Sequence, residues 1–283
     1  MMKILITGAN GYIGSHVAKY ISKNTPHTVI AVDFNNDRIQ NLNNIEYTNI
    51  DVLANSGNPD LYKMLKEPDA LIHFAWRDGF KHDSDAHLLY LGNHYLFLKN
   101  MIDSGCKNIN VMGTMHEVGY YTGEINENTP CNPMSLYGIA KNSLRQALLI
   151  YSSGKDISVK WLRAFYITGD DSLNHSVFAK ILEMANNGQK TFPFVAGTNK
   201  YDFININKLA EYIACASIQT SVNGIINVCS GKPVSLKDKV EEFIDENRLQ
   251  IKPEFGAYPS RKYDSPLIYG NIDKLNKILG KSK

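Results

Sequence analysis

The sequence predicts an α/β fold in which a doubly wound parallel sheet is joined to a smaller C-terminal α/β lobe. Two observations support this prediction. Short apolar runs alternate with segments of helical periodicity as far as about residue 169, as in strand–helix–strand units. A turn with three glycines follows the first run. Beyond residue 169 the alternation changes, so we expect two interleaved parts, 1–169 and 170–283, rather than independent domains.

The chain begins with a predicted strand and a glycine turn. Lys3 to Thr7 is a short, β-branched, apolar run that is typical of a buried parallel strand. Gly8, Gly11 and Gly14 follow, and Tyr12 to Ile21 has helical spacing. Glycines permit a tight turn and close backbone approach, so a pyrophosphate can bind at the helix N-terminus. The spacing differs by one residue from the G-x-G-x-x-G fingerprint, and a glycine turn without a ligand is the alternative.

Carboxylates follow the next two predicted strands. The second strand, Thr28 to Val32, ends at Asp33, where an acid can bond the ribose hydroxyls of an adenosine or, alternatively, cap a helix. A carboxylate there repels a 2′-phosphate, which favours NAD(H) over NADP(H), although the nearby Arg38 leaves NADP(H) open. The third strand, Ile45 to Ile50, is followed by Asp51, which either meets an adenine amine or is an ordinary turn residue.

The fourth predicted strand runs from Asp69 to Ala75. Ligands of such sheets bind outside the carboxyl ends of the strands, so Ala75 and Trp76 are expected to face the cofactor. His73 lies in the strand body and is expected to be packed and hydrogen-bonded. The next loop either contacts a substrate or is a solvated charge cluster, and it contains Arg77, Asp78, Lys81, His82 and Asp83.

A long helix and a fifth strand come next. The apolar side chains of the helix from Ala86 to Ser104 are expected to face the core, and they include Leu88, Leu89, Leu91, Leu96, Phe97 and Met101. Asn93 either points at the cofactor or satisfies backbone groups. The fifth strand ends at Thr114, whose hydroxyl can bond a reacting carbonyl oxygen. His116 and Glu117 either contact substrate or cap and pack the loop.

A tyrosine and a lysine stand four residues apart. The apolar spacing after Tyr137 predicts a helix, so Tyr137 and Lys141 lie one turn apart on one face. An ammonium favours the ionised form of a neighbouring phenol, so we expect the pKa of Tyr137 to be lowered toward working pH. Such a group suits proton exchange with a carbonyl and alcohol pair. The spacing is common, and a surface or packing pair is the alternative.

The second half of the chain is predicted to form the lobe. A sixth strand, Ser158 to Phe165, completes the alternating part. Helices are expected at 176–187, 209–218, after a cap at Ser235 and at 275–279, and strands at 199–205 and 225–228. This lobe should cover the carboxyl edge of the sheet and leave a cleft, which is a usual place for a ligand.

Composition excludes several classes of protein. A formal net charge of +2 over 283 residues, without a basic run, gives no support for binding nucleic acid or a membrane surface. Cysteines are scattered without metal-type spacing, so we expect no metal and a reduced, cytoplasmic protein. No apolar stretch approaches a spanning length, and the N-terminus runs directly into a strand rather than a signal peptide.

Several short motifs recur in a familiar order, namely Thr7-Gly8-Ala9-Asn10-Gly11-Tyr12-Ile13-Gly14, Asp33, His73-Phe74-Ala75, Thr114, Tyr137-Gly138-Ile139-Ala140-Lys141, Leu162-Arg163-Ala164-Phe165 and Asp202-Phe203-Ile204. Together they resemble the extended short-chain dehydrogenases/reductases of the sugar-nucleotide epimerase/dehydratase/reductase group, over nearly the whole chain. The resemblance implies a Rossmann domain, a C-terminal sugar-nucleotide lobe and a catalytic triad of Thr114, Tyr137 and Lys141. It also implies a homodimer formed through a helix pair that includes the tyrosine helix.

The resemblance also implies contacts to NAD(H) or NADP(H). The residues expected to contact the cofactor are Gly8, Asn10, Gly11, Tyr12, Ile13, Gly14, Asp33, Asp51, Val52, Phe74, Ala75, Trp76, Asn93, Tyr137, Lys141 and Phe165. The residues expected to contact substrate are Arg77, His116, Tyr166, Phe192 and Arg261. Phe192 would flank the nucleotide base or lie in a core loop, and Arg261 would clamp the diphosphate or be a surface arginine.

Departures from the family pattern narrow the range of reactions that we expect. Met115 and His116 stand where 4,6-dehydratases have an Asp-Glu pair, so elimination of water is not expected. Trp76, Tyr166 and Tyr201 replace an alanine, an asparagine and an arginine that are usual in UDP-galactose-type epimerases.

The compact length and the run from Gly113 to Tyr120 are similar to 4-keto-6-deoxyhexose reductases. We therefore expect NAD(P)H-dependent reduction of the C4 ketone of a nucleotide-linked, dTDP-type 4-keto-6-deoxyhexose, for surface polysaccharide sugars. The alternatives are an NAD-dependent nucleotide-sugar 4-epimerase and a non-catalytic cofactor sensor.

Overall fold

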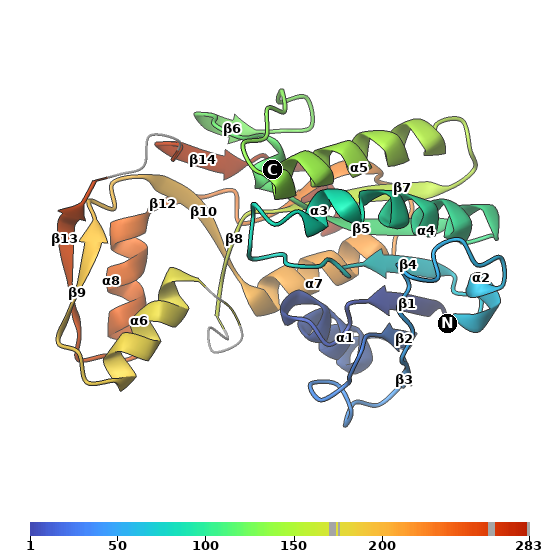
Figure 1. Cartoon of the computed structure of the whole chain (residues 1–283), viewed down its shortest axis with the longest axis horizontal. Coiled ribbons are helices and arrows are strands. Elements are labelled where there is room, and N and C mark those ends of the chain that lie inside the picture. The colour runs from blue at the N-terminus through green and yellow to red at the C-terminus, as the bar shows by residue number, and fades with distance from the viewer. Residues whose placement is uncertain (170–173, 175, 260–263, 282–283) are drawn as a thin grey trace.

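The computed structural model describes residues 1–169, 174, 176–259 and 264–281, and a seven-stranded sheet dominates this part of the chain. All pairs in the sheet are parallel. The strand order is β11 (Gly224–Val228), β7 (Ser158–Ala164), β5 (Asn108–Thr114), β4 (Ala70–His73), β1 (Lys3–Thr7), β2 (Thr28–Val32) and β3 (Ile45–Thr48) (Figure 1). The chain starts at β1 and builds outward on both sides, so the order reverses between β1 and β4. The predicted doubly wound sheet is confirmed.

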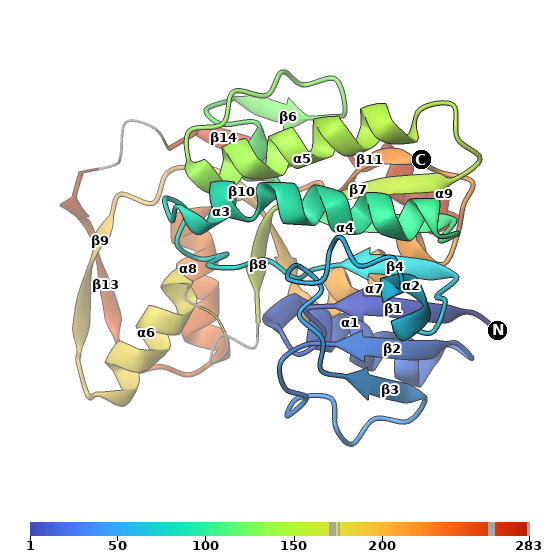
Figure 2. The ribbon, with the colours of Figure 1, turned by 45° about the vertical axis from the view of Figure 1, so that its right-hand side comes forward.

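Helices cover both faces of the sheet (Figures 1 and 2). One face packs against α1 (Tyr12–Asn24), α7 (Ile206–Ser217) and α9 (Asp273–Ile278). The other packs against α2 (Leu61–Met64), α4 (Leu91–Asp103) and α5 (Leu136–Ser152), with the short α3 (Ala86–Leu89) beside α5. Ile4 and Ile6 belong to the first core and Leu5 to the second. Alternating side chains are therefore buried on both faces, which explains why the strand is continuously apolar.

The second lobe is built around a smaller sheet. Its strand order is β12 (Pro233–Ser235), β10 (Lys200–Asn205), β14 (Leu267–Gly270) and β6 (Gly123–Ile125), and β8 (Tyr166–Thr168) also pairs with β10. The outer part contains a ribbon of β9 (Thr191–Val195) and β13 (Lys252–Tyr258) with the helices α6 (Val177–Asn186) and α8 (Leu236–Glu246) (Figure 2). A separate apolar core, which includes Phe178, Phe192 and Phe243, holds this outer part together.

The two parts exchange elements along the chain. β11 and α7 come from the second half of the sequence but complete the main sheet and its helical layer. β6 comes from the first half but pairs in the second sheet. The chain therefore crosses between the two parts several times.

The predicted helix from Ala86 to Ser104 differs from the structure in two ways. It is interrupted at Tyr90, which separates α3 from α4. Phe97 and Met101 are buried as expected, but Leu88, Leu89 and Leu96 are 44%, 75% and 47% exposed. In the described residues, no helix is both long enough and apolar enough to cross a membrane.

Candidate active site

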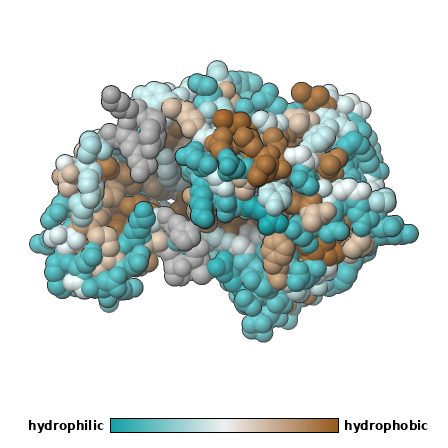
Figure 3. All heavy atoms as spheres, in the orientation of Figure 1, coloured by the Kyte–Doolittle hydropathy of each residue, from teal (hydrophilic) through white to brown (hydrophobic). Residues whose placement is uncertain are grey.

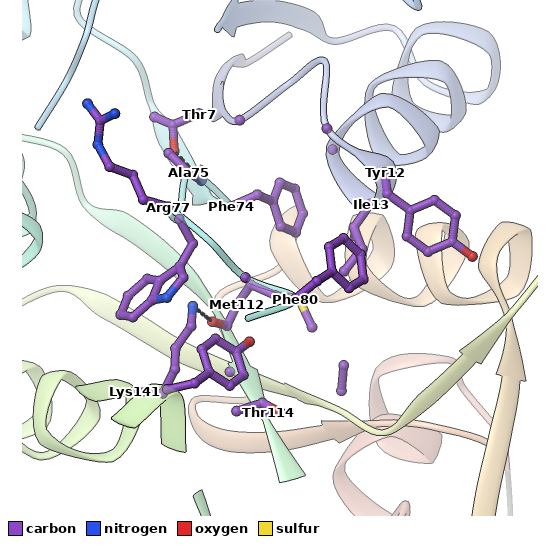
Figure 4. A pocket seen from close by; sticks show the side chains of 18 of the residues that line it. Thr7, Tyr12, Ile13, Phe74, Ala75, Arg77, Phe80, Met112, Thr114 and Lys141 are labelled. Atoms are coloured by element: carbon purple, nitrogen blue, oxygen red, sulfur yellow. Dashed lines mark hydrogen bonds between the residues drawn. The ribbon is translucent and has the colours of Figure 1, made fainter. Parts of the chain in front are cut away.

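A pocket of about 710 Å³ opens at the carboxyl edge of the main sheet. Its walls come from the ends of β1, β2, β4, β5 and β7, from the start of α1 and α5, and from residues that lead into the second lobe. This is the position where the strand order reverses, which is where ligands of such sheets bind. Figure 4 shows Thr7, Ile13 and Phe74 on one side of the pocket and Thr114 and Lys141 on the other.

The glycine turn lies very close to the end of β4. A Cβ atom on Gly8, which has a φ of +69°, would lie 2.7 Å from the Ala75 backbone nitrogen. A Cβ on Gly14 would lie 2.1 Å from the Gly8 carbonyl oxygen. Gly11 caps α1 without a side-chain hydrogen bond, and Gly11 to Gly14 line the pocket. The backbone at this helix N-terminus can therefore meet a phosphate group, as the sequence predicts.

Asp33 lines the pocket at the end of β2, and its carboxylate is oriented by the backbone. It accepts hydrogen bonds from the nitrogen atoms of Asn10 and Phe34, both at 2.8 Å. The side chain of Asn10 accepts a bond from the Arg38 backbone nitrogen at 2.9 Å, and Asn10 does not line the pocket. Asn10 therefore orders the turn around Asp33, and its contact with the cofactor stays a prediction.

Arg77 lines the pocket and is paired with an acid. Its guanidinium donates to the Asp51 carboxylate at 2.7 Å and lies over the rings of Tyr90, at 4.6 Å, and Phe34, at 5.8 Å. Phe34 follows β2, Asp51 follows β3, and Tyr90 lies between α3 and α4. Arg77 therefore pairs with Asp51 at the wall of the pocket, and its contact with substrate stays a prediction.

The three expected catalytic residues meet at the opposite wall. Thr114 ends β5, and Tyr137 and Lys141 lie in the first turns of α5. The Lys141 ammonium donates to the Met112 carbonyl at 2.7 Å (Figure 4) and lies 3.7 Å from the centre of the Trp76 ring. Ser135 caps α5 by accepting a bond from the Gly138 nitrogen at 3.1 Å. The cap fixes where the helix starts and hence where its first side chains point.

Burial reverses the expected charge effect on the tyrosine. The loss of solvent raises the pKa of Tyr137, the Glu117 charge raises it further, and the Thr114 side chain lowers it only in part. Burial also lowers the pKa of Lys141 to about 7, against the opposing effect of Glu117. The ammonium is therefore too weak a neighbour to ionise the phenol, and Tyr137 is protonated at neutral pH. The expected low pKa was wrong for this reason.

Two imidazoles line the pocket beside Tyr137. The His82 ring stacks on the Tyr137 ring with centroids 5.1 Å apart, and the His82 carbonyl accepts a bond from the Tyr137 nitrogen at 2.9 Å. His116 lies with its centroid 4.5 Å from that of His82. Burial lowers the pKa of both, that of His116 to about 4, so both rings are neutral. The sequence predicts that His82 lies in a charged loop, but no local pattern predicts that its ring stacks on Tyr137.

Further histidines hold Trp76 in place. Its ring stacks on His94 at 4.2 Å, and its indole nitrogen donates to His87 Nδ1 at 3.0 Å. His73 is buried, as expected, and bonds Thr7 at 2.7 Å and His94 at 2.9 Å. Trp76 is therefore a fixed wall of the pocket between the glycine turn and Lys141.

The remaining expected residues divide into three groups. Val52, Ala75, Phe165 and Tyr166 line the pocket, and the Tyr166 ring stacks on Tyr201 at 4.4 Å. Asn93 and Phe192 do not line it, and their contacts with cofactor and substrate stay predictions. Asn93 donates to the Leu53 carbonyl at 3.1 Å, and Phe192 is 3% exposed in the core of the lobe. Arg261 lies outside the described residues.

Known proteins are similar to this chain in sequence and in fold. The NAD dependent epimerase/dehydratase family matches residues 4–229. A protein of Aggregatibacter actinomycetemcomitans named dTDP-6-deoxy-L-talose 4-dehydrogenase (NAD(+)) is 45% identical over 273 residues, which cover 95% of this chain and 99% of that protein.

Two solved structures have the same fold. The structure of UDP-glucose 4-epimerase from Brucella ovis with NAD superimposes with a TM-score of 0.84 at 18% identity, over 100% of this chain and 94% of that one. The structure of UDP-glucuronic acid 4-epimerase from Bacillus cereus, with UDP-glucuronic acid and NAD, has a TM-score of 0.81 at 23% identity, over 99% and 94%.

Proposed function

Because the chain belongs to the NAD dependent epimerase/dehydratase family, we propose that it is an NAD(H)-dependent enzyme that reduces the C4 ketone of a dTDP-linked 4-keto-6-deoxyhexose. The observation that carries this proposal is the partly buried, protonated Tyr137, which lines the pocket beside Thr114 and Lys141. The 45% identical relative, whose name gives a dTDP-6-deoxyhexose as substrate and position 4 as the reacting centre, supports the sugar class.

The residues of the pocket fit a dinucleotide. Gly8 and Gly14 allow the turn to pack closely, since a Cβ at either position would collide with backbone, and the N-terminus of α1 that follows faces the pocket, where its backbone can meet phosphates. Asp33 is held where it can accept from ribose hydroxyls, and a 2′-phosphate would meet its charge, which supports NAD(H) over NADP(H). Lys141 would bind the nicotinamide ribose. A bound nicotinamide supplies or accepts the hydride in this chemistry.

The protein groups move the proton. In the direction of reduction, Tyr137 donates its hydroxyl proton to the oxygen that develops charge at C4. Thr114 holds that oxygen by a hydrogen bond. A phenol with a raised pKa is present in its donor form across neutral pH, which suits reduction. The neutral rings of His82 and His116 offer hydrogen bonds to sugar hydroxyls from the same wall, and Tyr166 does so from the start of the lobe. We keep Arg261 as the proposed partner of the diphosphate.

The first test follows the absorbance of reduced nicotinamide with dTDP-4-keto-6-deoxyglucose. We expect NADH to be consumed in proportion to the sugar, and faster than NADPH. Tyr137→Phe should lose on the order of 10²–10⁴-fold in rate while it folds normally, because only the hydroxyl is removed. Tyr151→Phe, on the exposed end of the same helix, is the matched control and should keep full activity. Normal turnover by Tyr137→Phe would contradict the assignment.

A 4-epimerase is the second candidate, because solved epimerases share the fold and the same triad can oxidise and reduce one sugar in turn. An epimerase would retain NAD through purification and would consume none. The measurement that separates the two functions is the net change in NADH on addition of sugar.

A homodimer is the proposed assembly. Exposed apolar side chains lie on α3, α4 and α5, the helix that carries Tyr137, and Figure 3 shows apolar residues gathered over these helices. They include Leu88, Leu89, Leu96, Ile139 and Ile150. A contiguous apolar surface on neighbouring helices is typical of a protein interface, and the family resemblance implies pairing through the same helices.

A further inference from the structure

Glu117 is a buried carboxylate directly behind the proposed catalytic wall. It is 0% exposed and lies in a 3₁₀ turn, Met115–Glu117, that follows β5. Its Oε1 atom accepts hydrogen bonds from the Thr114 nitrogen and from the indole nitrogen of Trp161, both at 2.7 Å. Its Oε2 atom lies 3.4 Å from Arg163 and 3.6 Å from Arg145. A charge without solvent is costly unless it is paired and bonded, and each oxygen of Glu117 has such partners.

The surrounding backbone is shaped around this carboxylate. A Cβ atom on Gly113 would lie 2.1 Å from the Trp161 indole nitrogen and 2.8 Å from Glu117 Oε1. A glycine at this position therefore leaves the space in which Trp161 and Glu117 meet. Thr114 and Glu117 form a reciprocal cap, because the Thr114 hydroxyl accepts from the turn while Glu117 accepts from the Thr114 nitrogen.

We propose that Glu117 is a positioning residue, which fixes Thr114 toward Tyr137 and sets the electrostatic field around Tyr137 and Lys141. This inference rests on the proposed function of the triad. Glu117 does not line the pocket, so it acts through its neighbours rather than on substrate.

The charged groups around the site determine the direction in which Glu117 shifts the pKa values of Tyr137 and Lys141. Arg145 from α5 and Arg163 from β7 pair with Glu117, and the charge of Glu117 also acts on Tyr137 and Lys141 in the first turns of α5. The rings that face Tyr137 belong to Trp76, His82, His87 and His116. The negative charge of Glu117 raises the pKa of both Tyr137 and Lys141. Removal of that charge should lower both, whereas loss of the Arg145 cation should raise both.

Glu117→Gln tests this directly, because the amide oxygen can still accept from Thr114 and Trp161. The readout is the titration of Lys141 by NMR in protein with ¹³C at the lysine Cε, with Lys141→Met to assign the signal. We expect the midpoint, about 7 in the wild type, to fall by on the order of one pH unit in Glu117→Gln and to rise in Arg145→Gln. Glu46→Gln, at an exposed ion pair on β3, should leave it unchanged.

The outcomes separate this inference from the proposed function. If the wild type turns over no nucleotide sugar, the proposed function fails, but the lysine titration still decides the role of Glu117. If sugar is reduced, the pH–rate profile of Glu117→Gln should move in the same direction as the lysine midpoint. A Glu117→Gln protein with a lower Tm but an unchanged midpoint and profile would show a purely structural role and overturn the proposal. If Glu117→Gln does not fold, Arg145→Gln serves as the test instead. An unchanged Lys141 midpoint in Arg145→Gln would also overturn the proposal.

Discussion

His73 and His94 form a buried pair at the end of β4. His73 Nε2 and His94 Nδ1 are 2.9 Å apart, and each side chain is 1% exposed. Burial lowers the pKa of His73 to about 3 and that of His94 well below its usual value. Both rings are therefore neutral in the folded protein, whereas they bind protons near pH 6.5 in the unfolded chain.

Stability should therefore fall as the pH drops through about 6.5, because the unfolded state then binds more protons than the folded state. Each histidine contributes up to about 1.4 kcal/mol per pH unit below that value. Urea unfolding at pH 7.5, 6.5 and 5.5 measures this slope, which should be shallower in His94→Gln than in the wild type. An equal slope in both proteins would contradict the neutral pair.

Gly14 should tolerate no side chain. A Cβ there would lie 2.1 Å from the Gly8 carbonyl oxygen, whereas a Cβ on Gly57 would meet no atom within 4 Å. We expect Gly14→Ala to weaken NAD binding at least tenfold and to lower the Tm, and Gly57→Ala to change neither. Calorimetric titration with NAD measures the affinity, and a Gly14→Ala protein that binds NAD normally would remove the glycine turn from the proposed cofactor site.

Single residues also show where sequence reasoning ends. Tyr137 and Lys141 could be paired from their spacing, but their pKa values depend on burial by Trp76 and on Glu117, which are distant in sequence from α5. Arg77 could be predicted to lie at the sheet edge, but not on which side. The spacing of charges does not reveal that Asp51 binds it.

At the scale of elements, the helices α3, α4 and α5 leave an apolar surface. Leu89 and Ile150 are 75% and 76% exposed. The sequence pattern predicted that the leucines of α3 and α4 face the core, because amphipathic spacing does not distinguish a core from a surface that a second subunit covers.

Replacement of Leu89 by aspartate should disrupt the proposed homodimer, because a carboxylate would be buried against an apolar partner. Light scattering coupled to size-exclusion chromatography measures the mass. We expect the wild type at twice the chain mass of 31.8 kDa and Leu89→Asp at the chain mass. Val234→Asp, on an exposed residue of β12, is the control and should stay dimeric. A wild-type monomer would contradict the assembly.

Strands differ in how well sequence predicts them. β1 and β2 are short apolar runs, and their positions were confirmed within a residue, as was that of β7. β6, β8 and β12 have three residues each and were missed. They form because distant segments pair, as β6 does with β14, and local sequence carries little of that information.

In the whole molecule, the carboxyl edge of the sheet brings together functional residues that are far apart in the sequence. The glycine turn near residue 8, Asp33 and the Tyr137 helix could be assigned to one pocket from the topology of parallel strands alone, and all three line it. The lobe was harder to predict, because β10 and β14 bring its segments together across a long stretch of sequence. For that reason Phe192 was expected in the site although it packs in the core of the lobe.

In the proposed reduction, a hydride passes from NADH to C4 of the sugar and stays there. The most direct test incubates the protein with dTDP-4-keto-6-deoxyglucose and NADH that carries deuterium at the transferable position, and then examines the product sugar by NMR and mass spectrometry. We predict one deuterium at C4 for each NADH consumed. A product sugar without deuterium and an undiminished NADH pool would contradict the reductase and point to hydride return within one turnover.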